Sequence, residues 1–88
     1  MAYQLDFSNL ANKDIEFHKN SGNKVLLKKM LGLFNELTDH PFEGTGKPEL
    51  LKHNLSGYWS RRINLEHWLI YEVIDNRILT HSAKGHYF

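Results

Sequence analysis

Cysteine is absent from the 88 residues of this chain, which excludes disulfide bonds, thiolate metal sites and cysteine nucleophiles together. Long apolar runs are missing as well, and no stretch approaches the roughly 20 apolar residues that a membrane-spanning helix needs. The first seven residues alternate apolar and polar side chains, unlike the basic and apolar regions of a signal peptide. We therefore expect a soluble, cytoplasmic protein that does not bind a membrane.

Motifs that hold metals or nucleotides are also missing. No two histidines follow the His-x-x-x-His spacing, and the run from Gly44 to Lys47 is too short for a phosphate-binding loop. There is no Gly-x-Ser-x-Gly nucleophile elbow either. We expect no metal and no other cofactor.

Aromatic residues are plentiful, at 12% of the chain, and they can supply a packed core. A chain of 88 residues is too short to divide into two such cores, so we expect residues 1–88 to form a single domain.

Positive charge is concentrated in the second half of the chain. Residues 1–44 carry five Lys against six Asp or Glu, whereas residues 45–88 carry six Lys or Arg against four acids. Between positions 45 and 62, four basic residues accompany a single acid, Glu49. From charge alone, this segment is either a phosphate-binding patch or an ordinary solvated surface.

The first half of the sequence predicts one strand and two helices. Residues 3–7 alternate as a half-buried strand does, and Ser8 or Asn9 can cap a helix that ends near residues 20–22. Apolar residues then recur at three- and four-residue spacing over 23–38, which indicates a core-facing helix. The short Ser-Gly-Asn connection predicts a helix hairpin.

The second half predicts an antiparallel sheet. Two glycines and a proline make residues 39–47 a loop, and strand-like runs follow at 57–63, 67–75 and 78–84, separated by turns at 64–66 and 75–76. The fold class is therefore α+β: an N-terminal strand, a two-helix hairpin and an antiparallel sheet with helices on one face.

Strand alternation separates the two adjacent arginines. In the first run of the sheet, Tyr58, Ser60 and Arg62 share one side, while Trp59, Arg61 and Ile63 share the other. Only one arginine of the pair can therefore face a functional site. The alternation also places Trp59, Ile63 and Tyr71 in the core.

The remaining polar residues suit the metal-free cleavage of RNA. In that reaction the 2′-hydroxyl attacks its own phosphate, so an enzyme needs a base, cations around the phosphorane and an acid for the leaving 5′ oxygen. Glu49 could serve as the base and His86 as the acid, with Lys52 and Arg62 as the cations. Composition does not show whether these residues converge.

The order of these residues is that of a known family. Residues 41–49 (PFEGTGKPE), 52–63 (KHNLSGYWSRRI), Glu66-His67, residues 71–73 (YEV) and the closing His86-Tyr87 resemble the YoeB/Txe toxins of the RelE superfamily. The resemblance is densest over 41–73, and residues 1–40 share only the pattern of elements.

The resemblance implies a compact microbial RNase fold and a toxin of a type II toxin–antitoxin system that cleaves messenger RNA in the ribosomal A site. It also implies inhibition by a Phd/YefM-type antitoxin and, commonly, homodimerisation. A further reading, compatible with this one, is a corepressor that binds operator DNA only within the antitoxin complex. Position by position, Glu49 matches the general base, Lys52 and Arg62 match phosphate-binding cations, His86 matches the general acid, and Tyr87 matches an aromatic that positions substrate.

One position departs from the family. After Glu66-His67 the family has an arginine in its phosphate site, whereas this chain has Trp68. An indole offers one N–H and a ring for base stacking in place of a permanent charge with five donors. The alternative function is therefore an attenuated toxin that still binds its antitoxin and the ribosome. Of the other histidines, we expect structural roles for His53 and His67 and surface positions for His18 and His40.

Overall fold

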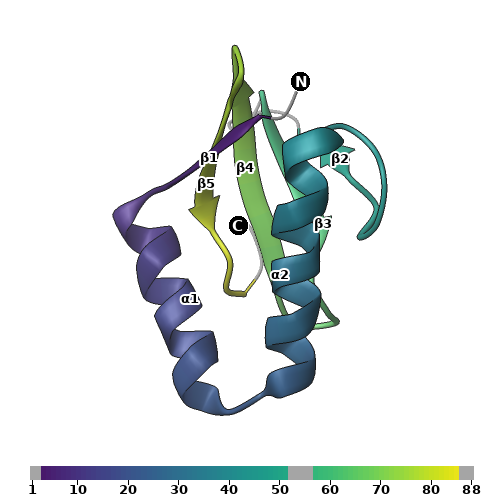
Figure 1. Cartoon of the computed structure of the whole chain (residues 1–88). Helices are drawn as coiled ribbons and strands as arrows, with labels where there is room; N and C mark the ends of the chain where they lie inside the picture. The colour runs from purple at the N-terminus through teal and green to yellow at the C-terminus, as the bar shows by residue number, and fades with distance from the viewer. Residues whose placement is uncertain (1–2, 52–56, 86–88) are drawn as a thin grey trace.

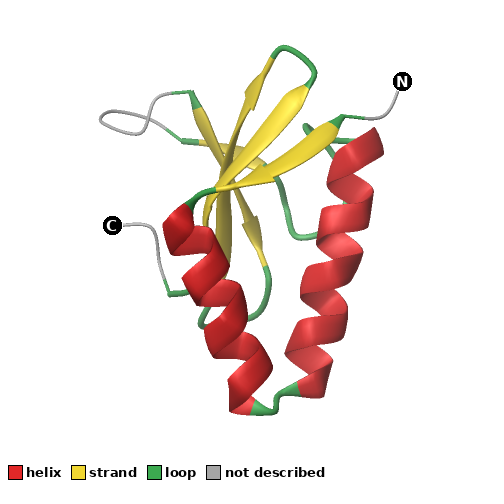
Figure 2. Ribbon diagram, turned by 60° about the vertical axis from the view of Figure 1, so that its left-hand side comes forward, coloured by secondary structure: helices red, strands yellow, loops and turns green. Residues whose placement is uncertain are grey.

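The computed structural model describes residues 3–51 and 57–85. The elements follow in the order β1 (Gln4–Phe7), α1 (Asn9–Ser21), α2 (Lys24–Asp39), β2 (Glu49–Leu50), β3 (Tyr58–Arg62), β4 (Trp68–Ile74) and β5 (Arg77–Ser82). The two helices lie side by side on one face of the sheet (Figures 1 and 2). This arrangement confirms the predicted α+β class.

Local signals in the sequence set the helix boundaries. Ser8 caps α1 because its side-chain oxygen accepts a hydrogen bond from the Ala11 N–H at 3.0 Å, and Asn23 caps α2 in the same way. Gly22 ends α1 in the left-handed conformation, at φ 76°, which glycine adopts without strain. The predicted helix hairpin is confirmed.

The sheet has five strands in the order β1-β5-β4-β3-β2. The predicted antiparallel meander of β3, β4 and β5 is present. Two features were not predicted. β1 joins β5 in parallel, which makes the sheet mixed, and the two-residue strand β2 pairs with β3 at the opposite edge. Strand alternation reports which face a residue occupies but not which strand becomes its neighbour.

The core lies between the helices and the sheet. Its helical side is supplied mainly by α2, and Tyr71 and Ile63 are fully buried on its sheet side, as the alternation predicts. Trp59 is partly buried against this cluster and contacts Phe42. The helical core residues of α2 are Leu26, Met30, Leu33, Phe34 and Leu37. The helices therefore cover one face of the sheet, and no described helix packs on the other, which we call the open face although Ser60 and Ile70 on it are buried. None of the helices in the described part of the chain is long and apolar enough to cross a bilayer.

Candidate active site

The loop over residues 40–48 leads from α2 to Glu49 at the start of β2. Gly46 fixes the end of this loop, because its carbonyl oxygen accepts a hydrogen bond from the Arg62 N–H at 2.7 Å. A Cβ on Gly46 would lie 2.8 Å from the Arg62 carbonyl oxygen, and φ here is 83°, so glycine is required. The backbone of β3 thus fixes the position at which strand β2 begins with Glu49.

Arg61 holds the rest of this loop from the helix side of the sheet. Its guanidinium is fully buried and pairs with Glu36 of α2, with 2.8 Å between Nη1 and Oε1. It also donates to three loop carbonyl oxygens, those of His40, Glu43 and Thr45. A planar donor group of this kind can satisfy several acceptors at once, so one side chain fixes the loop path.

The pKa values of two groups that contact Arg61 are shifted. Burial by itself would raise the pKa of Glu36, but hydrogen bonds from Thr45 and Arg61 and the charge of Arg61 outweigh it, so the pKa lies below its ordinary value. Burial raises the pKa of Tyr71, whose hydroxyl donates to the Pro41 carbonyl oxygen at 2.7 Å and accepts from Arg61 Nε at 3.2 Å. The Glu36 carboxylate therefore stays charged and the Tyr71 hydroxyl stays protonated near neutral pH.

Arg62 points to the opposite, open face of the sheet, as the alternation predicts. Glu49 pairs with Ser60 in the register of β2 and β3, and Arg62 is two residues further along β3. Directly paired residues and residues two apart share a face of a sheet. Glu49 and Arg62 are both exposed, so a carboxylate and a cation lie on one accessible surface.

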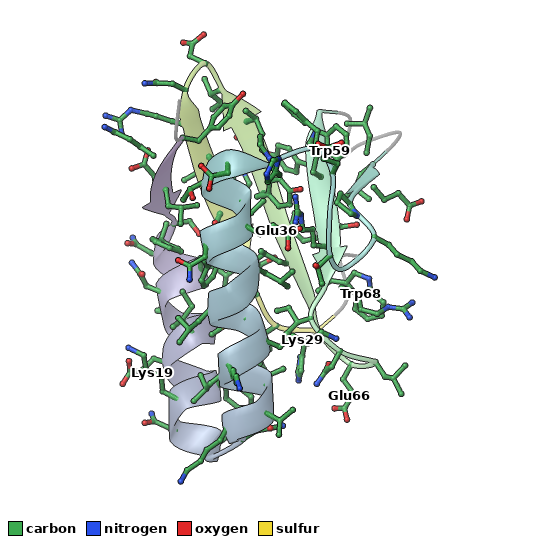
Figure 3. The ribbon with its side chains drawn as sticks, turned by 45° about the vertical axis from the view of Figure 1, so that its right-hand side comes forward. Lys19, Lys29, Glu36, Trp59, Glu66 and Trp68 are labelled. Atoms are coloured by element: carbon green, nitrogen blue, oxygen red, sulfur yellow. The ribbon has the colours of Figure 1, made fainter. Side chains whose placement is uncertain are left out.

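Trp68 joins this surface from β4, where it pairs directly with Arg62. Figure 3 shows its ring at the end of the sheet beside the loop that carries Glu66, whereas Glu36 lies between α2 and the sheet. The Arg62 guanidinium carbon lies over the indole at 5.2 Å from its centroid, within the range of a cation–π contact. The remaining cation therefore stacks on the residue that departs from the family pattern.

Two contacts hold Gly85, the last described residue, at the start of β4. Its carbonyl oxygen accepts from the Trp68 N–H at 3.0 Å, and its own N–H donates to His67 Nδ1 at 2.8 Å. An imidazole nitrogen that accepts must be unprotonated. Burial lowers the pKa of His67 and so favours this neutral form. The predicted structural role of His67 is confirmed.

The surface position expected for His18 is wrong. His18 is almost fully buried, its Nε2 lies 2.7 Å from the Ala83 carbonyl oxygen, and its ring packs edge-on against that of His67. Asp14 accepts from the Ala83 N–H at 2.9 Å. The helical pattern did not reveal these roles, because the partner is a backbone segment 65 residues further along the chain.

Four residues singled out from the sequence lie outside the described residues. They are Lys52, His53, His86 and Tyr87. Glu49, Arg62 and Trp68 are the predicted site residues that the structure brings to one face. Within residues 3–51 and 57–85, no group of three or more His, Asp or Glu side chains could hold a metal ion.

Comparison with known proteins assigns the family. Residues 7–87 match the family model described as the YoeB-like toxin of bacterial type II toxin–antitoxin systems. Toxin YoeB of Escherichia coli (strain K12) is 52% identical over 64 residues, which cover 73% of this chain and 76% of that protein. The chain belongs to the YoeB toxin family. It is therefore a toxin of the type II toxin–antitoxin class, and the predicted RelE-superfamily resemblance is confirmed.

Solved structures of the same family agree in fold. The YoeB–YefM heterotetramer from Staphylococcus aureus contains a chain that is 42% identical to this YoeB-family toxin, with a TM-score of 0.83 over 99% of this chain and 100% of that one. The YoeB dimer from Staphylococcus aureus gives 42% identity and a TM-score of 0.84, with the same coverage of both chains.

Proposed function

We propose that this YoeB-family toxin is a metal-independent endoribonuclease that cleaves messenger RNA on the ribosome. The observation that carries the proposal is the β2–β3 register, which sets Glu49 opposite Ser60, two residues from Arg62 on the open face. An exposed base beside an exposed cation is the minimum that attack by the 2′-hydroxyl requires.

In the proposed reaction, Glu49 accepts the proton of the 2′-hydroxyl as its oxygen forms a bond to the adjacent phosphorus. Arg62 stabilises the negative charge that develops on the phosphorane. The bond from phosphorus to the 5′ oxygen then breaks, and His86 donates a proton to that oxygen. The products are a 2′,3′-cyclic phosphate and a 5′-hydroxyl.

Three further roles follow from the family resemblance. We assign Lys52 to the phosphate, His86 to general acid catalysis and Tyr87 to substrate positioning. Gly85 is hydrogen-bonded to the backbone of Trp68, directly across from Arg62.

The Arg62–Trp68 contact favours an attenuated enzyme as the second candidate function. The Arg62 guanidinium stacks on the indole of Trp68, where the family has a further arginine in its phosphate site. Loss of one preorganised donor at a developing oxyanion lowers the rate by about 10² to 10³. Such a toxin would still bind its antitoxin and the ribosome.

The proposed partners are an antitoxin, the ribosome with its message, and a second copy of the toxin. The Staphylococcus aureus relatives are solved as a YoeB–YefM complex and as a YoeB dimer. By analogy, we propose that a Phd/YefM-type antitoxin inhibits this chain, that operator DNA is bound only within that complex, and that the toxin acts in the cytoplasm as a homodimer. An acidic antitoxin segment would complement Arg62 on the open face.

Replacing Glu49 with Gln tests the catalytic assignment, because the amide keeps the shape of the side chain but cannot accept the proton. We expect ribosome-bound message to remain uncut while the melting temperature is unchanged. Glu16→Gln, the same change on the exposed side of α1, is the matched control and should cleave normally. Primer extension on translating ribosomes measures both variants. Cleavage by folded Glu49→Gln at the unmodified rate would exclude Glu49 as the base.

A further inference from the structure

A second polar cluster lies on the open face of the sheet, away from Arg62. Glu72 of β4 and His81 of β5 are joined by a contact of 2.9 Å between Oε1 and Nε2, and each side chain is about a quarter exposed, at 26% and 27%. Tyr58 of β3 stacks on the His81 ring, with centroids 4.6 Å apart and planes 23° apart. Three neighbouring strands thus contribute one side chain each to an accessible acid–imidazole–phenol group.

This cluster and the candidate catalytic residues lie on the same face of the sheet, although Ser60 and Ile70 between them are buried. Tyr58 pairs with Glu72 just as Arg62 pairs with Trp68, and Tyr58, Ser60 and Arg62 alternate to the same side of β3. Four residues of strand separate Tyr58 from Arg62, or about 13 Å. Glu49 lies opposite Ser60, midway between them. An RNA strand that contacts Arg62 can therefore run along this face toward the cluster.

The charge of the cluster formed by Tyr58, Glu72 and His81 suits a nucleobase and not a phosphate. An ionised carboxylate only accepts hydrogen bonds, so His81 donates to Glu72 from Nε2, and the carboxylate keeps lone pairs for further donors. The negative charge of Glu72 repels phosphate, but it attracts the amino and imino N–H groups of a base edge. The Tyr58–His81 stack offers the aromatic surface on which unpaired bases pack.

The donor pattern of the four bases selects among them. The Watson–Crick edge of guanine presents an imino and an amino N–H side by side, which match the two oxygens of one carboxylate. Adenine and cytosine present an amino group beside an acceptor nitrogen, and uracil presents one N–H between two carbonyl oxygens that the carboxylate repels. Glu72 should therefore favour guanine most and uracil least.

We propose that Tyr58, Glu72 and His81 form a nucleobase subsite that selects guanine next to the scissile phosphate. The proposal rests on the proposed ribonuclease function and adds a determinant of sequence preference to it. Glu72 is its specificity-determining residue, and the aromatic pair supplies affinity for any base.

Two measurements on the full chain test the subsite separately from the catalysis. The first is equilibrium binding of short ribo-oligonucleotides that carry a single central guanine or uracil, followed by fluorescence anisotropy. The second is single-turnover cleavage of ribosome-bound messages that differ only by guanine or uracil beside the cut. Glu72→Gln is the variant, Glu16→Gln on the helix side is the matched control, and Tyr58→Leu removes the stack.

We expect the unsubstituted protein and Glu16→Gln to prefer guanine by roughly 5- to 150-fold, the discrimination of one good bidentate contact to a base. Glu72→Gln should lose most of this preference and keep its fold. Tyr58→Leu should weaken the binding of both oligonucleotides to the same extent, whereas Tyr58→Phe should bind both as the unsubstituted protein does.

The outcomes distinguish this proposal from the ribonuclease proposal. Equal binding of both bases, or an unchanged preference in Glu72→Gln, overturns the subsite even if the message is cleaved. A Glu72-dependent guanine preference without any cleavage supports the subsite and overturns the ribonuclease function. If Glu72→Gln weakens only the binding of an antitoxin, the cluster is a protein contact and the subsite proposal is wrong.

Discussion

Arg61 and Arg62 are adjacent in the sequence and carry the same charge, yet they belong to two different regions of the molecule. Arg61 lies on the helix-facing side of β3, fully buried, and holds Glu36 and three loop carbonyl groups. Arg62 lies on the open face, exposed, over the ring of Trp68. The helix-facing side of this sheet therefore holds the fold together, whereas the open face carries the residues of the proposed site. Changes to the two faces should therefore affect different measurements.

The largest expected effect is on stability and comes from the helix-facing arginine. Arg61→Met removes one partner of a buried ion pair. Glu36 then keeps only its hydrogen bond from Thr45, and the loop carbonyl groups lose the donors that Arg61 supplied, so the fold should be destabilised by about 3–5 kcal/mol. Arg62→Met should change stability by less than about 0.5 kcal/mol, as exposed substitutions do, while it lowers cleavage. Urea unfolding of both variants measures the difference. Equal loss of stability would contradict the division of roles between the two faces.

A second expected effect concerns catalysis on the open face. Trp68→Arg restores the arginine that the family has at this position and should accelerate single-turnover cleavage of ribosome-bound message by about 10² to 10³. Because the new charge directly opposes Arg62 across the strands, it should also cost about 0.2–1 kcal/mol of stability.

Trp68→Leu is the control for this change, since it removes the ring without adding charge. It should bring no acceleration. If Trp68→Arg and Trp68→Leu cleave equally fast, the indole is not what limits the rate, and the attenuated reading of this toxin is wrong.

The smallest expected effect is the pH dependence of stability that His67 causes. Burial lowers the pKa of His67 in the folded protein below its ordinary value of 6.5. Above pH 6.5 the His67 imidazole is neutral in both the folded and the unfolded protein, and its contribution to stability is fully present. As the pH falls below this value, the unfolded chain binds a proton that the folded chain resists, so stability declines until the lower, folded pKa is reached.

Thermal melts at about pH 8 and about pH 5.5 test this sign. His67→Asn keeps an acceptor for the Gly85 N–H but cannot titrate, so its melting temperature should fall less on acidification. His40→Asn, at an exposed histidine, is the control and should behave like the unsubstituted protein. If the melting temperature of His67→Asn falls more on acidification than that of the unsubstituted protein, the assigned direction of the His67 pKa shift is wrong.

The sequence by itself determined the helices, the strands of the meander and the assignment of Arg61 and Arg62 to opposite faces. These depend on capping residues and on periods of 3.6 and 2, which are local properties of the chain. Residue order also identified the YoeB family, which the comparisons confirm. Glu49 could be singled out because the basic segment holds one acid, whereas the choice of Arg62 over Arg61 came from the resemblance to the YoeB/Txe toxins.

Only the tertiary structure decided which distant segments meet. The parallel pairing of β1 with β5, the edge strand β2, the burial of His18 beneath Ala83 and the grouping of Tyr58, Glu72 and His81 on three strands were not predicted. Each depends on contacts between residues far apart along the chain, and the periodicity of one segment does not report which distant segment packs against it. The pairing of the strands therefore brings the residues of the open face together, although the sequence alone already showed that each residue is present.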